Sequence, residues 1–232
     1  MEFQKHQPGN FCWPELGSTN TDAAKKFYGN LLGWTSMDVP GPGMIYTMFQ
    51  LSGKDVAGLY ALMPEQIKQG FPPAWLCYVS VESADNTAKR VQELGGNVML
   101  EPMDIPEAGR TALFQDPLGA TFGVWQAGKH IGARIINEVG AFCWAELATS
   151  DEKAARGFYQ ELFRWDHEIM PTEKFEYIIF KNDGQPAAGM FQITPDMQGL
   201  SPSWFVYFAV ADCDQSVQKA QGGRRKRDGA AN

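Results

Sequence analysis

A long internal repeat is the feature that most limits how this chain can fold. The stretch at residues 9–34, GNFCWPELGSTNTDAAKKFYGNLLGW, returns at residues 140–165 as GAFCWAELATSDEKAARGFYQELFRW, an offset of 140 − 9 = 131. Twelve of the 26 aligned positions are identical, and the offset continues without a gap to the pair Gly58 and Gly189. A repeat of this length indicates a duplicated structural unit, so the fold has to be read for each unit separately.

The composition is that of an ordinary globular protein, with 44% hydrophobic and 20% charged residues in a chain of 232. This length and the repeat predict two units that each bury a core. A net charge of −7 argues against nucleic-acid binding, which needs a basic surface. The sequence has neither an apolar run of about 18 residues nor a signal-peptide pattern. We therefore expect no membrane partner and a cytoplasmic location.

The four cysteines of the chain stand singly, and no two of them form a CxxC pair. This spacing is not that of a zinc knuckle or a disulfide framework. The pattern favours reduced, buried thiols.

Each complete unit is predicted to contain two modules of the order βαβββ. In the first module, a helix begins at the capping candidates Asn20, Thr21 and Asp22 and ends at Gly33, between strands at 11–16, 35–39, 44–51 and 56–62. Matching Trp13 to Trp75 gives a weaker inner repeat, with 75 − 13 = 62. Its elements are expected at 75–81, 84–94 (the helix), 98–101, 111–115 and 121–126.

The second unit matches the first only in part, because the likeness fails after Gln221 and the chain ends GGRRKRDGAAN. We expect a truncated or frame-shifted gene, a disordered basic tail, and a homo-oligomer that covers the incomplete second unit. The expected divisions are unit one at 1–127 (modules 9–65 and 74–127), a linker at 128–139, an incomplete unit two at 140–221 and the tail at 222–232.

The modules and two motifs carry a resemblance to a known family. The motifs are AAKKFYGNLLGW at residues 23–34, and Gly109-Arg110 followed by DPLGATF at residues 116–122. Together they resemble the vicinal oxygen chelate superfamily over residues 9–221, and in particular its tandem-unit bacterial members labelled glyoxalase-like or hydroxylase. The superfamily includes glyoxalase I, extradiol dioxygenases, fosfomycin-resistance enzymes and bleomycin-binding proteins. The resemblance implies an α+β fold of paired βαβββ modules that form curved mixed sheets.

The resemblance also implies a metal site, with His or Gln from the first strand of each module and Glu from the last strands. In this sequence tryptophans hold the first-strand positions, and the last-strand position falls on Gly123. An indole nitrogen has no lone pair to offer a metal. The three histidines, His6, His130 and His167, lie outside the strands that would line the site. We therefore expect the usual metal site to be absent and no cofactor to be bound.

If the strands keep the family's facing, one concave face carries three indoles, one thiol and one carboxylate. Such a trough suits a planar or apolar small molecule that carries a donor or a positive charge. A buried glutamate with a raised pKa can act as general acid or base, and Arg110 could hold an anionic group of the ligand. The candidates are Glu15 and Glu146 for catalysis, and Trp13, Trp75, Cys77, Arg110, Trp125, Trp144 and Trp204 for ligand binding, with Gly123 on the same face.

Each candidate also has a structural interpretation. The tryptophans could fill the trough as core, Glu15 could be a rim carboxylate paired with a basic residue, and Arg110 could simply be exposed. Cys77 as a nucleophile lacks a histidine partner that the sequence can place.

Two classes of function remain open, apart from a chain that has lost activity. The first is a metal-independent binding or enzymatic module for a hydrophobic metabolite or antibiotic, with the trough of unit one as its site. The second is a metal-dependent enzyme of glyoxalase or dioxygenase type with displaced ligands, such as Glu15 with Glu146 or Glu101. The absence of histidines from the inner strands favours the first class.

Overall fold

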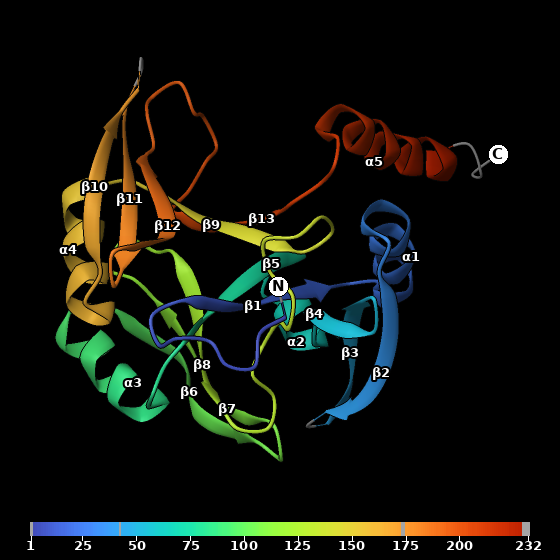
Figure 1. Cartoon of the computed structure of the whole chain (residues 1–232), viewed down its shortest axis with the longest axis horizontal. Coiled ribbons are helices and arrows are strands. Elements are labelled where there is room, and N and C mark those ends of the chain that lie inside the picture. The colour runs from blue at the N-terminus through green and yellow to red at the C-terminus, as the bar shows by residue number, and fades with distance from the viewer. Residues whose placement is uncertain (1, 42, 173–174, 229–232) are drawn as a thin grey trace.

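Two curved mixed sheets, each flanked by helices, make up the computed structural model of this protein, which describes residues 2–41, 43–172 and 175–228 (Figure 1). The expected α+β class with curled sheets of βαβββ modules is confirmed.

Unit one forms an eight-stranded sheet in the order β2-β3-β4-β1-β5-β8-β7-β6. Its two modules meet where β1 pairs antiparallel with β5 at the centre. A short helix, α2, lies between the modules and was not expected from the sequence. The elements are β1 (Phe11–Ser18), α1 (Thr21–Leu32), β2 (Thr35–Gly41), β3 (Met44–Leu51), β4 (Lys54–Ala61), α2 (Pro64–Lys68), β5 (Ala74–Ser80), α3 (Ala84–Glu93), β6 (Asn97–Ile105), β7 (Gly109–Gln115) and β8 (Thr121–Ala127).

Unit two repeats the first five strands of this sheet in the order β10-β11-β12-β9-β13. Within the described residues, β13 pairs only with β9, and no counterparts of β6, β7 and β8 lie beside it. One edge of the second sheet is therefore unpaired. The elements are β9 (Phe142–Thr149), α4 (Glu152–Phe163), β10 (Asp166–Pro171), β11 (Glu176–Asn182), β12 (Gln185–Gln192), β13 (Ser203–Phe208) and α5 (Cys213–Asp228).

The repeat is visible in how the first helix of each unit begins. The side chain of Asn20 accepts a hydrogen bond from the Ala23 amide at the start of α1. Asp151 caps α4 in the same way by accepting from Ala154. Both are residues whose short side chains favour this position, and the capping expectation for Asn20 is confirmed.

The two units pack with their helix sides together. One buried core contains side chains of both units, among them Phe11, Val79, Phe122, Phe142, Leu147 and Tyr159. The helices meet in pairs across this seam, α3 with α4 and α1 with α5 (Figure 1). The concave faces of both sheets consequently point away from each other.

Two tryptophans bind the units to each other in a reciprocal way. The indole of Trp34 donates to the carbonyl of Gly140 at 2.6 Å, and that of Trp165 donates to the carbonyl of Gly9 at 2.9 Å. The four residues are equivalent pairs at the offset of 131, since 165 − 34 = 131 and 140 − 9 = 131. The glycines have φ values of +88° and +86°, a backbone conformation that favours glycine.

The C-terminal segment, where the sequence predicts a disordered tail from residue 222, is described as far as Asp228. Helix α5 extends to Asp228, so the basic residues of 222–228 continue a helix, as lysine and arginine readily do. Residues 229–232 lie outside the described residues. In the part of the chain that the structure describes, no helix has the length and apolar character needed to cross a lipid bilayer.

Replacing Trp34 or Trp165 by Phe should destabilise the protein. Each substitution leaves a buried carbonyl of the other unit without its donor, at a cost of about 1–3 kcal/mol. Urea unfolding measures the change. The control is Trp144→Phe, where the indole is partly exposed and the loss should be smaller. Equal losses in all three variants would contradict the role given to the seam.

Candidate functional site

Unit one holds a half-buried carboxylate between two phenols. Glu15 on β1 accepts hydrogen bonds from the hydroxyls of Tyr46 on β3 and Tyr78 on β5, each at 2.7 Å. The indole of Trp13 donates to the oxygen of Tyr46 at 3.0 Å. No lysine or arginine pairs with Glu15 among the described residues, so a rim carboxylate with a basic partner is not what the structure shows.

The same network stands in unit two. Glu146 accepts from Tyr177 at 2.6 Å and from Tyr207 at 2.7 Å, while Trp144 donates to Tyr177 at 3.0 Å. Each element of the network comes from the equivalent strand of the second sheet, β9, β11 or β13. The repeat has thus duplicated a four-residue arrangement of one Trp, one Glu and two Tyr.

The pKa values of these groups follow from burial and mutual contact. Burial raises the pKa of Glu15, and the hydrogen bonds from both phenols oppose this shift only in part. Burial, and then the neighbouring Glu15 charge, raise the pKa of Tyr46 and Tyr78 well above the usual value. Burial and the bond to Glu146 raise the pKa of Tyr207 to about 12. All these phenols therefore remain donors at neutral pH.

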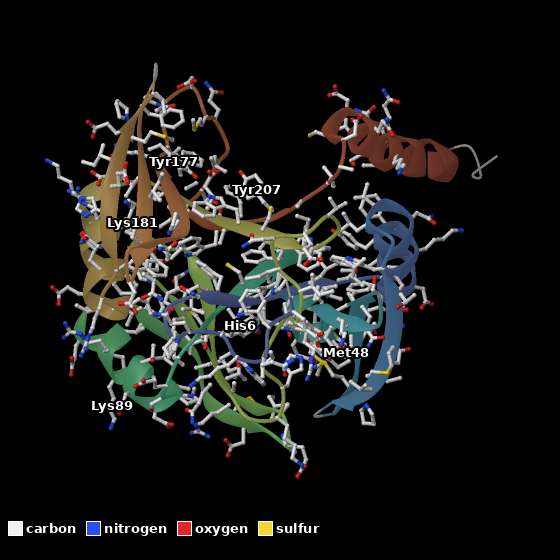
Figure 2. All side chains as sticks on the ribbon, in the orientation of Figure 1. His6, Met48, Lys89, Tyr177, Lys181 and Tyr207 are labelled. Carbon is white, nitrogen blue, oxygen red and sulfur yellow. The ribbon has the colours of Figure 1, made fainter. Side chains whose placement is uncertain are left out.

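The two networks differ in access. Trp13 and Tyr78 are 6% and 7% exposed, whereas Tyr207 is 44% exposed and Trp144 is partly exposed. In unit one β8 lies beside β5 and places Trp125 in the same buried cluster. The counterpart of β8 is missing beside β13 within the described residues. We call the first network closed because its Trp13 and Tyr78 are buried, and the second open because its Tyr207 is exposed, while Glu15 and Glu146 are both half-buried. Figure 2 shows Tyr177 and Tyr207 of the open network.

His130 completes the cover of the first network, although the sequence placed it outside the site. Its ring packs edge-on to Trp13 with ring centroids 4.7 Å apart, and to Trp125 at 5.8 Å. The indole of Trp125 donates to the His130 carbonyl, and the Gly132 amide donates to Nδ1. Burial lowers the pKa of His130. The linker thus folds back over the concave face, and no local sequence pattern predicts this contact.

Three expected trough residues lie on the other side of the sheets. Trp75 donates to the hydroxyl of Tyr28 on α1, and Trp204 donates to that of Tyr159 on α4, both at 2.9 Å. Cys77 is 1% exposed in the core shared by the units, and burial raises the pKa of its thiol. The expectation that these side chains share a face with Trp13 is wrong.

The reason is a shift of one residue in strand facing. The inner repeat matches Trp13 to Trp75, but in the sheet Trp13 lies opposite Tyr78, and Trp75 lies opposite Leu16. A one-residue change moves every side chain of a strand to the opposite face. Tyr78 and Tyr207 therefore take the concave positions that had been given to the tryptophans.

Arg110 also lies away from the concave face. Its guanidinium makes two hydrogen bonds of 2.9 Å to Asp85, at the start of α3, and one of 2.9 Å to Asp104 on β6. These carboxylates raise the pKa of Arg110 and occupy its donors. The structure places Arg110 in a surface ion pair and not beside Glu15.

Glycines on β4, β8 and β12 leave room for tyrosine side chains from other strands. A β-carbon at Gly58 would overlap the Tyr46 hydroxyl, and one at Gly189 would overlap the Tyr177 hydroxyl. At Gly123 a β-carbon would overlap the ring of Tyr78. The position at which the resemblance implied a ligating glutamate is therefore filled by a tyrosine ring from a neighbouring strand.

The residues present do not fit the divalent metal that the resemblance implies. Among residues 2–41, 43–172 and 175–228, no group of three or more His, Cys, Asp or Glu is placed to hold a metal. Glu15 and Glu146 belong to different sheets, and Glu101 is exposed on the edge strand β6. We derive no chemistry through a metal at either network.

The four tyrosines are the site residues that the sequence reasoning missed. A signal was present, because Tyr46 and Tyr177 are equivalent at the offset of 177 − 46 = 131. Tyr78 and Tyr207 likewise match through the aligned strands that begin at Trp75 and Trp204, since 78 − 75 = 207 − 204 = 3. Their role needed the cross-strand register, which only the sheet supplies.

Gly58→Ala should destabilise the protein more than Gly189→Ala. The methyl group at residue 58 pushes Tyr46 against the buried Trp13, and overpacking of this kind costs about 1–3 kcal/mol. At residue 189 the displaced Tyr177 moves with the partly exposed Trp144. Urea unfolding of both variants makes the comparison, and a cost at residue 189 as large as at 58 would contradict the difference in access.

The raised pKa of Glu15 gives a pH dependence with a definite sign. The folded state holds this proton more tightly than the unfolded state, in which the carboxyl has its usual value of 4.5. Its contribution to stability is complete below that value and is lost as the pH rises through the higher folded pKa. Relative to Glu15→Gln, the wild-type protein should lose unfolding free energy as the pH rises above 4.5 towards neutral and beyond. A difference that stays flat in urea titrations over this range would disprove the shift.

Comparison with known proteins finds relatives that match most of this chain. The family model described as Glyoxalase/Bleomycin resistance protein/Dioxygenase superfamily matches residues 13–124. CFP32 of Mycobacterium tuberculosis (strain CDC 1551 / Oshkosh), which carries a provisional glyoxylase name, is 38% identical over 93% of this chain and 83% of its own. The anthracycline biosynthesis protein DauV of Streptomyces sp. (strain C5) is 34% identical over 92% and 81%.

Solved structures agree on the fold. The Mn(II)-bound glyoxalase of Novosphingobium aromaticivorans superposes with a TM-score of 0.61 at 14% identity, covering 95% of this chain and 71% of that one. A 2,2',3-trihydroxybiphenyl 1,2-dioxygenase of Sphingomonas wittichii strain RW1 gives 0.60 at 11% identity, covering 95% and 79%. At these identities the likeness concerns the fold alone. With the repeated modules, the curved sheets and relatives above 30% identity, the chain belongs to the glyoxalase/bleomycin resistance/dioxygenase superfamily.

Proposed function

We propose that this chain binds a small planar or apolar molecule, a metabolite or antibiotic, on the concave face of unit two. The observation that carries the proposal is the duplicated network, of which one copy is closed and the other exposed. The open copy presents the same aromatic and acidic groups with Tyr207 exposed to solvent.

The chemistry of the open face supports such a ligand. Trp144, Tyr177 and Tyr207 offer aromatic surface, and Phe191 lies opposite Tyr177 on the neighbouring strand. Aromatic rings contribute most of the contact energy in sites of this kind, while a few polar groups fix the orientation. Glu146 is the polar group here. The name of the Streptomyces relative supports a metabolite or antibiotic as the class.

The first network takes a different role in this proposal. Trp13 and Trp125 belong to a buried cluster with Tyr78 and Met48, so they act as core that fixes the centre of sheet one. Glu15 remains a candidate acid or base only for a ligand that displaces the cover formed by His130.

We also propose a cytoplasmic location. All four cysteines are unpaired thiols, two of them fully buried. Unpaired thiols are typical of reducing compartments.

Binding of 2-naphthol tests the proposed function. This neutral planar probe should quench tryptophan fluorescence saturably in the millimolar range or below. The saturated, non-planar decahydro-2-naphthol should bind roughly tenfold more weakly, because it cannot stack on the rings. Tyr207→Phe should weaken the binding of 2-naphthol, whereas the matched Tyr78→Phe in the closed copy should not. Absence of saturable binding, or an effect of Tyr78→Phe alone, would reject the proposal.

The alternative function, a metal-dependent enzyme of glyoxalase or dioxygenase type, has its own test. Metal analysis of the purified protein should find substoichiometric zinc, nickel, manganese and iron. Treatment with EDTA should leave 2-naphthol binding unchanged. One metal ion per chain, together with ligand binding that depends on it, would favour the alternative.

A further inference from the structure

We propose that the natural ligand of the open network carries an organic ammonium group, which Glu146 and the surrounding rings bind. This inference rests on the proposed function and adds the charge of the ligand to it.

The four side chains of the open network have acceptor positions left over but no free polar proton. Trp144 donates its only N–H to Tyr177, and both Tyr177 and Tyr207 donate their hydroxyl protons to Glu146. Every polar proton of these four side chains is therefore used inside the network. What remains are acceptor sites, because a carboxylate has about four lone-pair positions and two phenols occupy only two of them.

No lysine or arginine pairs with Glu146 among the described residues. Lys181, on the same strand as Tyr177, pairs instead with Glu168 on β10, and Figure 2 shows its position on β11. The acidic group thus stands among aromatic rings without a positive charge beside it.

Aromatic rings surround the Glu146 carboxylate. Faces of Trp and Tyr rings attract ammonium groups through the ring quadrupole, and the attraction grows when water is partly excluded. Tyr177 and Tyr207 donate to the Glu146 carboxylate, and Trp144 donates to the hydroxyl of Tyr177. An anionic or acceptor-only ligand would meet a carboxylate and no free donor. A ligand with an ammonium group satisfies both the charge and the open acceptor positions.

A pair of probes that differ in charge but not in shape tests this inference. Choline carries a trimethylammonium group, and 3,3-dimethylbutan-1-ol replaces its nitrogen by carbon. Calorimetric titration of the full chain should show roughly tenfold tighter binding of choline. The preference should shrink in 0.5 M salt, because the site is open to solvent and salt screens exposed charges.

Three variants separate the charge from the fold. Glu146→Gln keeps the shape of the side chain and should bring the preference for choline close to one. Glu168→Gln removes a carboxylate from the same sheet outside the network and should leave the preference as in the wild type. Tyr207→Phe keeps the ring and should retain part of the preference, which shows that the site still forms.

The outcomes are distinguishable. Equal binding of the two probes, or a preference that survives Glu146→Gln, would overturn the inference. If 2-naphthol binds but choline shows no preference, the ammonium group is rejected while the proposed function stands. If neither 2-naphthol nor choline binds, both are rejected.

Discussion

Packing of the two units through their helix sides is the constraint on which the rest of this structure depends. Trp34 and Trp165 each donate to a glycine carbonyl of the other unit, and a single core runs between the sheets. Because the helix sides are buried against each other, both concave faces must point outward. The location of every candidate site follows from this arrangement, and so does the approximate twofold relation of the units.

The two outward faces then diverge because the sheets differ in width. In unit one, β8 and the linker complete the concave side, and Trp13, Tyr78 and Trp125 pack there as core. In unit two, the sheet ends at β13 within the described part of the chain. The same four-residue network consequently stands in two environments, one in which Trp13 and Tyr78 are buried and one in which Tyr207 is exposed.

The sequence predicted the modules well, but it predicted the wrong facing for β5 and β13. Helix caps, turns and apolar stripes are local signals, which is why α1, α4 and most strands lie where they were expected. The concave position of Glu15 and Trp13 followed from alternation along one strand. The predicted facing of Trp75 and Trp204 was wrong because the comparison of modules by sequence carries an uncertainty of one residue. In a strand that uncertainty exchanges the two faces.

The sequence by itself determined that the chain is a duplicated βαβββ protein, since identical residues at a fixed offset must build equivalent elements. It also determined, by alternation along one strand, that Trp13 and Glu15 share a face, as do Trp144 and Glu146. Only the tertiary structure decided which side chains surround Glu15 and Glu146, because two phenols from two other strands meet each glutamate through cross-strand register. It also decided that one network is covered and the other exposed, because cover depends on neighbours far away in the chain.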